Sequence, residues 1–175
     1  GWPINNHDKR ANGVIDFATV LQVSSNVGMV QAMRRLDDGE YWSWMNRLGI
    51  DQRPDTDLPG AVACQLKSKK QFTSQSIEPA TTAFGQGFSL TPLKLVQLHA
   101  MIANGGRLVS PHITRGFRSG DALAPASAPT GHQLIRPDVT RTVLSWMESV
   151  VDKGSGKGVK TPGFRIGGKT GTCLL

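Results

Sequence analysis

The segment TPLKLVQLHAMIANGG, residues 91–106, constrains the fold of this chain more than any other stretch. Thr91 is a favourable N-cap, Pro92 suits the first helical position, and Asn104-Gly105-Gly106 favours a helix end. One stripe of this helix consists of Leu95, Leu98 and Ile102. Because much of the helix surface is apolar, we predict that the helix is buried and that other elements pack around it. A chain of 175 residues, 38% of them hydrophobic, is expected to form one domain with its own core.

Four further helices are predicted from apolar residues at helical spacing and from start and stop signals. Asp16 is an N-cap candidate for the first of them, Gly49 ends the third, and Gly154 ends the last. The predicted ranges are 17–23, 27–36, 40–48 and 137–153. The tripeptide Ser24-Ser25-Asn26 interrupts the pattern between the first two ranges, so these residues are expected at a helix junction.

Two strands are predicted, one over 107–113 with an interruption at Pro111, and one that begins at Phe164 and runs into GGKTGT. Residues 51–80 and 118–133 are interpreted as loops, because they are polar and rich in proline or in small residues. The stretch GSGKGV, 154–159, lacks the glycine spacing and the Ser or Thr of a phosphate loop. It is interpreted as the turn between the last helix and the last strand, and nucleotide binding is not expected.

The net charge of +7 indicates either a basic, well-solvated surface or attraction to an anionic partner. Nucleic-acid binding is not expected, because no run of Lys and Arg exceeds two residues. Cys64 and Cys173 lie far apart, and the four histidines show no metal-ligand spacing, so neither a metal site nor a cofactor is predicted. No apolar run approaches the length of a membrane span.

Alone, Ser-x-Asn and Lys-Thr-Gly are weak motifs. Their order here, SSNVG, then FGQGFSLTPLKLVQLHAMIANGG, then GKGV and GGKTGT, resembles the class B penicillin-binding proteins, and among them the bacterial cell-division transpeptidases. The resemblance covers nearly the whole chain and implies an α/β (α+β) fold of the serine β-lactamase and penicillin-binding-protein transpeptidase type. The expected architecture is a helical lobe plus part of an antiparallel sheet.

The resemblance implies a serine acyl transfer in which D-Ala-D-Ala stem peptides of peptidoglycan are cross-linked. It implies that Ser24, Asn26 and Lys169 are catalytic: Ser24 relays a proton, Asn26 orients the catalytic lysine, and Lys169 supplies positive charge. The implied substrate-binding residues are Ser25, Thr170, Gly171 and Thr172. The two threonine hydroxyls would hold a carboxylate, Gly171 would let the substrate lie beside the strand, and the Thr172 N–H would be an oxyanion donor.

Structural alternatives remain open at this stage. Ser24 is a residue type that could merely cap the helix that starts near Val27, and Lys169 could be a solvated strand lysine. Gly85 and Gly87 are interpreted as a turn that frames the cleft.

The family's S-x-x-K element is missing, since no serine of this chain has a lysine three residues later. We therefore expect residues 1–175 to be a partial transpeptidase domain, incomplete at both ends and inactive by itself. S-x-x-K would lie upstream of the chain and further strands would follow K-T-G.

The parent protein is expected at the outer face of the cytoplasmic membrane, through an N-terminal anchor outside this chain. Its expected partners are the stem peptide, β-lactams as covalent inhibitors, and division or cell-wall synthesis proteins. The alternatives are a non-catalytic β-lactam sensor or cell-wall scaffold, and a serine β-lactamase of the same fold.

Overall fold

The computed structural model describes residues 3–126 and 131–171. Within these residues the chain forms seven α-helices, four short strands and one 3₁₀ helix. In chain order they are α1 (Phe17–Gln22), α2 (Asn26–Met33), α3 (Asp38–Arg47), α4 (Lys69–Ser74), α5 (Ile77–Thr82), α6 (Pro92–Ala103), β1 (Arg107–Val109), β2 (Gly116–Ser119), β3 (Ala122–Pro125), β4 (Gly131–Gln133), α7 (Pro137–Asp152) and η1 (Lys157–Val159). The five helices predicted from sequence are confirmed, with ends shifted by a few residues.

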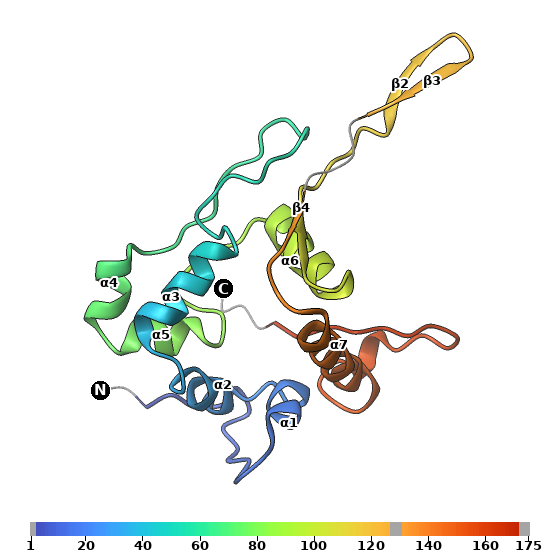
Figure 1. Ribbon diagram of the computed structural model, residues 1–175. Helices are drawn as coiled ribbons and strands as arrows, with labels where there is room; N and C mark the ends of the chain where they lie inside the picture. Colours follow the sequence, from blue (N-terminus) through green and yellow to red (C-terminus); the bar gives the residue numbers. More distant parts are fainter. Residues whose placement is uncertain (1–2, 127–130, 172–175) are drawn as a thin grey trace.

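The helices form two packed groups, and α1 contacts both (Figure 1). In the first group, α3 packs on α4 and α5, and α5 also contacts α2. In the second group, α7 contacts α1 and α6, and α6 also contacts β1. Because α1 contacts both α2 and α7, the junction between α1 and α2 lies where the two groups meet.

Two clusters of buried side chains hold the first group together. Val30, Met33 and Ala80 form one cluster between α2 and α5. Met45, Ile50 and Cys64 form the other, and Leu98 of α6 packs against it. On α7, Met147, Val150 and Val151 are buried, so the C-terminal half of this helix contributes to the core.

Helix α6 is less buried than the sequence predicted. Leu95 is 45% exposed, and the fully buried positions include two polar residues, Lys94 and Gln97. The polar atoms of these two side chains have hydrogen-bond partners inside the protein. Lys94 Nζ donates to Gln97 Oε1 at 2.8 Å, and Gln97 Nε2 donates to the Val109 carbonyl of β1 at 2.7 Å. The buried stripe is therefore rotated toward β1, which supplies a hydrogen-bond acceptor there.

The interpretation of residues 51–80 as loop is wrong for its second half, where α4 and α5 form. Ser68 and Gln71 make a capping box, in which each side chain pairs with the other residue's backbone, and Phe72 is buried with an exposed fraction of 1%. Pro79 is compatible with α5 because it occupies the first turn, where a helical N–H has no partner within the helix.

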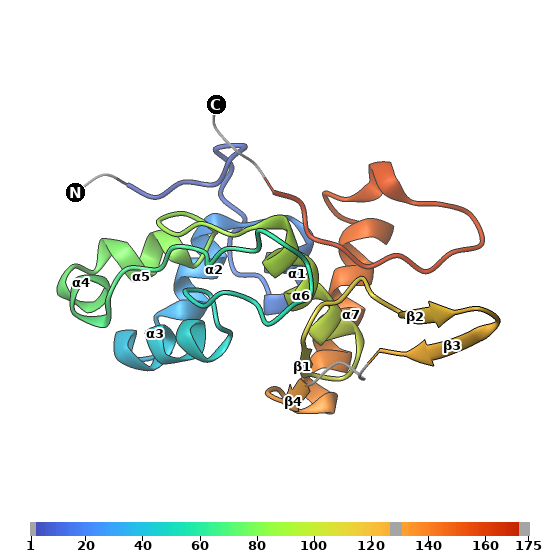
Figure 2. The same ribbon diagram turned by 90° about the horizontal axis from the view of Figure 1, so that it is seen from above.

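The predicted loop at 118–133 also contains strands. Strands β2 and β3 form an antiparallel hairpin that projects away from the helices in both views (Figures 1 and 2). Gly120 occupies its two-residue turn with φ +60°, a left-handed conformation that such turns require. Strand β4 pairs antiparallel with β1, and β1 ends at Val109, four residues before the predicted end.

The strand predicted from Phe164 onward is not observed in the described residues. Residues 164–171 are irregular because no described strand lies beside them to form a ladder. Instead they run along α7: Arg165 pairs with Glu148 at 2.9 Å, and the Gly168 N–H donates to the Met147 carbonyl at 3.1 Å. The stretch 154–159 contains the predicted turn after α7, and it continues into the short 3₁₀ helix η1, which was not predicted.

Candidate active site

The Ser24-Ser25-Asn26 tripeptide forms the junction between α1 and α2. Ser24 has φ +59°, a left-handed conformation that is uncommon for residues other than glycine. Ser25 is the N-cap of α2, because its hydroxyl accepts the Gly28 N–H at 3.0 Å. The capping alternative for Ser24 is therefore wrong, and the Ser24 side chain is available for another contact.

That contact is with Lys169, which is 145 residues away along the chain. Lys169 Nζ donates to Ser24 Oγ at 2.6 Å. It also donates to the Thr170 carbonyl at 3.0 Å and lies 3.4 Å from Thr170 Oγ1. An ammonium group has three N–H donors, so these contacts account for all of them.

Helix packing brings the two segments together. Phe17 of α1 and Trp146 of α7 make an edge-to-face ring contact with centroids 5.4 Å apart. Ser24 follows the end of α1, and residues 165–168 run along α7 just before Lys169. The packing of α1 on α7 therefore sets the distance between the serine and the lysine.

Lys169 carries the electrostatic character of the site. The residue is exposed as a whole, yet the surrounding protein desolvates its ammonium group and lowers the pKa of Lys169 below its ordinary 10.5. Because Ser24 Oγ accepts from Lys169, the Ser24 proton is left free to be donated elsewhere. This arrangement can pass a proton through a hydroxyl while holding a positive charge beside it.

Asn26 and Ser25 are bound by the N-terminal segment. Asn26 Nδ2 donates to the Asn5 carbonyl at 3.1 Å. Ser25 Oγ donates to Asn6 Oδ1 at 3.0 Å, and the same Asn6 oxygen accepts the Val27 N–H at 3.2 Å. Ser25 is 3% exposed, so its hydroxyl is engaged inside the protein and does not reach Lys169.

Asn6 is a site-supporting residue that sequence reasoning missed. It is buried, it bonds Ser25 and Val27, and its amide nitrogen donates to the Arg10 carbonyl at 2.7 Å. The asparagine lies in a turn-rich segment, and nothing in the sequence linked it to a motif about twenty residues later. It fixes the start of α2 and thereby the position of Asn26.

The K-T-G residues differ in how far the structure describes them. Thr170 is half-buried, and its hydroxyl lies 2.9 Å from Ser155 Oγ. At Gly171 a Cβ atom would meet no described atom within 4 Å, so there is open space beside the backbone. Thr172 lies outside the described residues, and its assignment stays a prediction.

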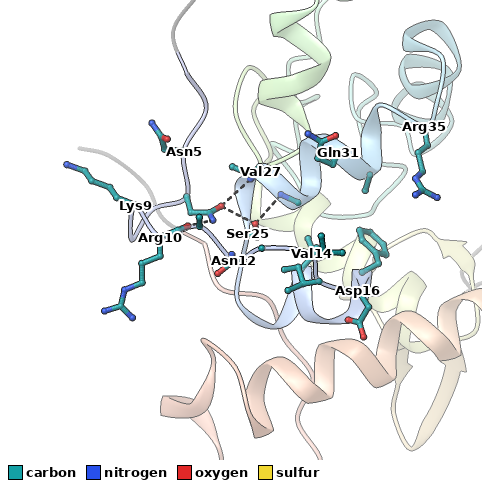
Figure 3. A pocket seen from close by; sticks show the side chains of 18 of the residues that line it. Asn5, Lys9, Arg10, Asn12, Val14, Asp16, Ser25, Val27, Gln31 and Arg35 are labelled. Atoms are coloured by element: carbon teal, nitrogen blue, oxygen red, sulfur yellow. Dashed lines mark hydrogen bonds between the residues drawn. The ribbon is translucent and has the colours of Figure 1, made fainter.

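A separate cavity of about 1150 Å³ lies between the N-terminal segment and helices α1 and α2 (Figure 3). Figure 3 shows Lys9, Arg10 and Arg35 around its rim and Ser25 at its inner wall. The cavity shares Ser25 with the SSN motif, but Ser24, Asn26 and Lys169 do not line it. The cavity is therefore distinct from the place where Ser24 meets Lys169, and that place is the candidate active site.

Among the residues that the structure describes, no group of three or more His, Cys, Asp or Glu side chains is placed to hold a metal ion. In the same residues, no helix combines the length and the apolar character needed to cross a membrane.

The site brings together a cationic lysine, a serine in a left-handed backbone conformation at a helix junction and a threonine–glycine segment. Comparison with known proteins identifies the family. Residues 1–173 match the penicillin-binding protein transpeptidase domain, and the chain belongs to this family.

Named relatives agree with this assignment. The chain is 37% identical over 177 residues to a peptidoglycan D,D-transpeptidase FtsI homolog of Mesostigma viride, covering 92% of this chain and 30% of the relative. It is 31% identical over 165 residues to the stage V sporulation protein D of Bacillus subtilis, covering 93% of this chain and 25% of the relative. The chain thus spans a third or less of these relatives.

Solved structures confirm the fold. The transpeptidase domain of penicillin-binding protein 3 from Burkholderia pseudomallei aligns with a TM-score of 0.78 at 32% identity, covering 91% of this chain and 46% of that one. Penicillin-binding protein 3 from Mycobacterium tuberculosis, complexed with aztreonam, aligns with a TM-score of 0.82 at 27% identity, covering 91% of this chain and 37% of that one. The predicted transpeptidase-like fold is therefore confirmed.

Proposed function

We propose that residues 1–175 form part of the transpeptidase domain of a peptidoglycan D,D-transpeptidase that binds penicillin. The observation that carries this proposal is the 2.6 Å contact from Lys169 Nζ to Ser24 Oγ, which joins the S-x-N and K-T-G motifs in one site. The names of the relatives support the same activity, as does the complex of one relative with aztreonam.

In the proposed reaction a serine outside these residues attacks the carbonyl of the D-Ala-D-Ala bond. The hydroxyl proton of that serine passes to the lysine of S-x-x-K, the peptide C–N bond breaks, and the departing D-Ala amine takes a proton that Ser24 relays. The acyl group is then transferred from the serine to an amine of a neighbouring stem peptide, and the serine regains its proton. A β-lactam replaces the donor peptide in the first step and remains on the serine.

The residues of this chain bind and orient the donor. Lys169 attracts the terminal carboxylate; at an effective dielectric near 20, two unit charges about 4 Å apart attract by roughly 4 kcal/mol. Thr170 donates its hydroxyl proton to that carboxylate, and the open space at Gly171 admits the substrate backbone. Asn26 orients the lysine of S-x-x-K, and the Thr172 N–H would be an oxyanion donor. Ser25 is left with a structural role.

The proposed reaction places the protein at the outer face of the cytoplasmic membrane, where peptidoglycan is assembled. Stem peptides are the proposed substrates, and division or cell-wall synthesis proteins are proposed partners. The charge of +7 suits a surface near anionic lipids and wall polymers.

Covalent labelling of the full-length protein with a fluorescent penicillin tests this function. We expect a stable label on the wild-type protein. Lys169→Ala should slow labelling by about two to three orders of magnitude, because the carboxylate loses its cationic partner. Lys70→Ala is a matched control: Lys70 is exposed on α4, and its removal should leave the rate unchanged.

Absence of a label on the wild-type protein would contradict the transpeptidase function and favour a non-catalytic scaffold. Rapid release of the label would favour a β-lactamase instead. Equal labelling rates for Lys169→Ala and Lys70→Ala would contradict the assignment of Lys169 as a carboxylate-binding residue.

A further inference from the structure

The turn that follows α7, residues 154–156, lies against the end of α1. The Ser155 N–H donates to the carbonyl of Gln22, the last residue of α1, at 3.0 Å. At Gly154 a Cβ atom would lie 2.2 Å from that same carbonyl oxygen, so only glycine permits this approach. The turn therefore contacts the chain two residues before Ser24.

The side chain of Ser155 makes a second contact, with the K-T-G segment. Ser155 Oγ lies 2.9 Å from Thr170 Oγ1. Thr170 Oγ1 in turn lies 3.4 Å from Lys169 Nζ, which donates to Ser24 Oγ at 2.6 Å. These contacts close a ring through Gln22, Ser155, Thr170, Lys169 and Ser24. One residue thus joins the two motif segments from outside both motifs.

The number of protons on the Thr170 hydroxyl decides which member of the Ser155–Thr170 pair donates the hydrogen bond. A hydroxyl has one O–H to donate and two lone pairs that accept. Lys169 as an ammonium group can only donate to Thr170, and a carboxylate on the ligand can only accept. If Thr170 donated to Ser155, it would have no proton for the carboxylate. Ser155 must therefore donate to Thr170 whenever Thr170 donates to a ligand.

We propose that Ser155 is a positioning residue that donates its hydroxyl proton to Thr170 and so directs the Thr170 proton toward the carboxylate of the donor peptide or β-lactam. This proposal rests on the proposed transpeptidase function. Ser155 acts through Thr170 and does not touch the reacting atoms. Its effect is confined to ligands that carry the carboxylate.

The experiment uses the full-length protein as wild type, Ser155→Ala and Ser155→Thr. For each, the second-order acylation rate is measured with a penicillin and with the methyl ester of the same penicillin, which lacks the charged carboxylate. For Ser155→Ala we expect the rate with the free acid to fall about tenfold, the typical effect of one lost hydrogen bond near a charged group. The rate with the ester should change less than twofold.

Two further readouts separate positioning from structure. Ser155→Thr keeps the hydroxyl and should restore the preference for the acid over the ester to within a factor of about three. Ser155 is exposed, and its backbone bond to Gln22 is retained in both variants, so the melting temperature should not change.

The outcomes distinguish this proposal from the function on which it rests. No acylation of the wild-type protein by either compound removes the proposed function, and this proposal with it. If the wild-type protein is acylated and Ser155→Ala slows the acid and the ester equally, or slows neither, the function stands and the positioning role of Ser155 is overturned. A selective loss with the acid that threonine restores supports it.

Discussion

Replacing Ser25 with alanine tests whether the two serines of the SSN motif have different roles, Ser25 as the N-cap of α2 and Ser24 in the proposed chemistry. Ser25 Oγ accepts the Gly28 N–H at 3.0 Å and donates to Asn6 Oδ1 at 3.0 Å, and the residue is 3% exposed. Alanine removes both hydrogen bonds without adding volume. The Gly28 N–H then loses its cap, and the buried Asn6 oxygen keeps only the Val27 N–H.

The expected loss can be estimated from these two bonds. An N-cap hydroxyl contributes about 1 kcal/mol, and a buried neutral hydrogen bond contributes about 1 kcal/mol more. We therefore expect Ser25→Ala to lower the local stability of the α2 N-terminus by about 2 kcal/mol. Because about 1.4 kcal/mol corresponds to a factor of ten, the amides at this end of α2 should exchange with solvent about 30-fold faster.

The assay is amide hydrogen exchange over residues 25–33 of the full-length protein, combined with the rate of penicillin acylation. Ser24→Ala is the matched control, because it removes the hydroxyl of the preceding residue and leaves the Ser25 cap in place. Ser25→Ala should accelerate exchange and slow acylation only modestly. Ser24→Ala should slow acylation strongly and leave the exchange of α2 unchanged.

The reverse pattern would refute this division of roles. If Ser25→Ala left exchange over 25–33 unchanged and reduced acylation as much as Ser24→Ala, then Ser25 would contact the substrate, as the family resemblance implies. The cap described here would then contribute little to the stability of α2.

Two further predictions concern the loop that holds Asp57 and the turn that follows α7. The Asp57 carboxylate accepts the backbone N–H groups at 113 and 114. A hydrogen bond from the Thr114 side chain, together with these backbone bonds, lowers the pKa of Asp57 from 3.8 to about 2. A depressed carboxyl pKa stabilises the fold above pH 3.8 and loses this effect as the pH falls toward 2. Relative to an unprotected amide at the same pH, the amides at 113 and 114 should lose protection in that window, and Asp57→Asn should lower their protection at neutral pH. Equal protection in the wild type at pH 2 and at pH 5 would contradict the role of the Asp57 carboxylate. Gly154→Ala should destabilise the protein and slow acylation, because its Cβ would lie 2.2 Å from the carbonyl of the last residue of α1. The added Cβ of Gly158→Ala meets no described atom within 4 Å, so this control should leave the melting temperature and the acylation rate unchanged. Similar melting temperatures for the two variants would show that the turn can move away from α1.

The helices could be predicted where local signals agree with packing. Pro137 at the start of α7 and Thr91 before α6 mark helix starts by their own chemistry, and both helices were found. The failures occurred where tertiary contacts decide. Leu95 is apolar and yet exposed, whereas Lys94 is charged and yet buried, because Lys94 donates to the buried Gln97 side chain, which in turn donates to the carbonyl of Val109 in β1. No periodicity in the sequence indicates that the lysine is buried and the neighbouring leucine exposed.

The site could be predicted as motifs but not as geometry. Only the family resemblance indicates Ser24 and Lys169 together, since a pattern within either segment cannot show that residues 145 positions apart touch. Local reasoning could not tell Ser24 from Ser25 either, because both are good cap residues at a junction. The backbone decides: Ser25 has the extended conformation of an N-cap, and Ser24 does not. Asn6 and Ser155 carry no sequence signal beyond being polar residues in turns.

The left-handed backbone at Ser24 connects local strain to function. A residue with a Cβ in this conformation costs roughly 1–2 kcal/mol, which glycine would avoid. The neighbouring backbone holds Ser24 there, because its N–H donates to the Leu21 carbonyl at 3.2 Å and the next N–H, of Ser25, donates to the Val20 carbonyl at 3.0 Å. A hydroxyl kept at such a position needs a reason outside the turn, and the contact with Lys169 supplies one. In this conformation the Ser24 side chain leaves the capping role to Ser25 and meets the lysine, so the strain is the local cost of the contact on which the proposed proton relay depends.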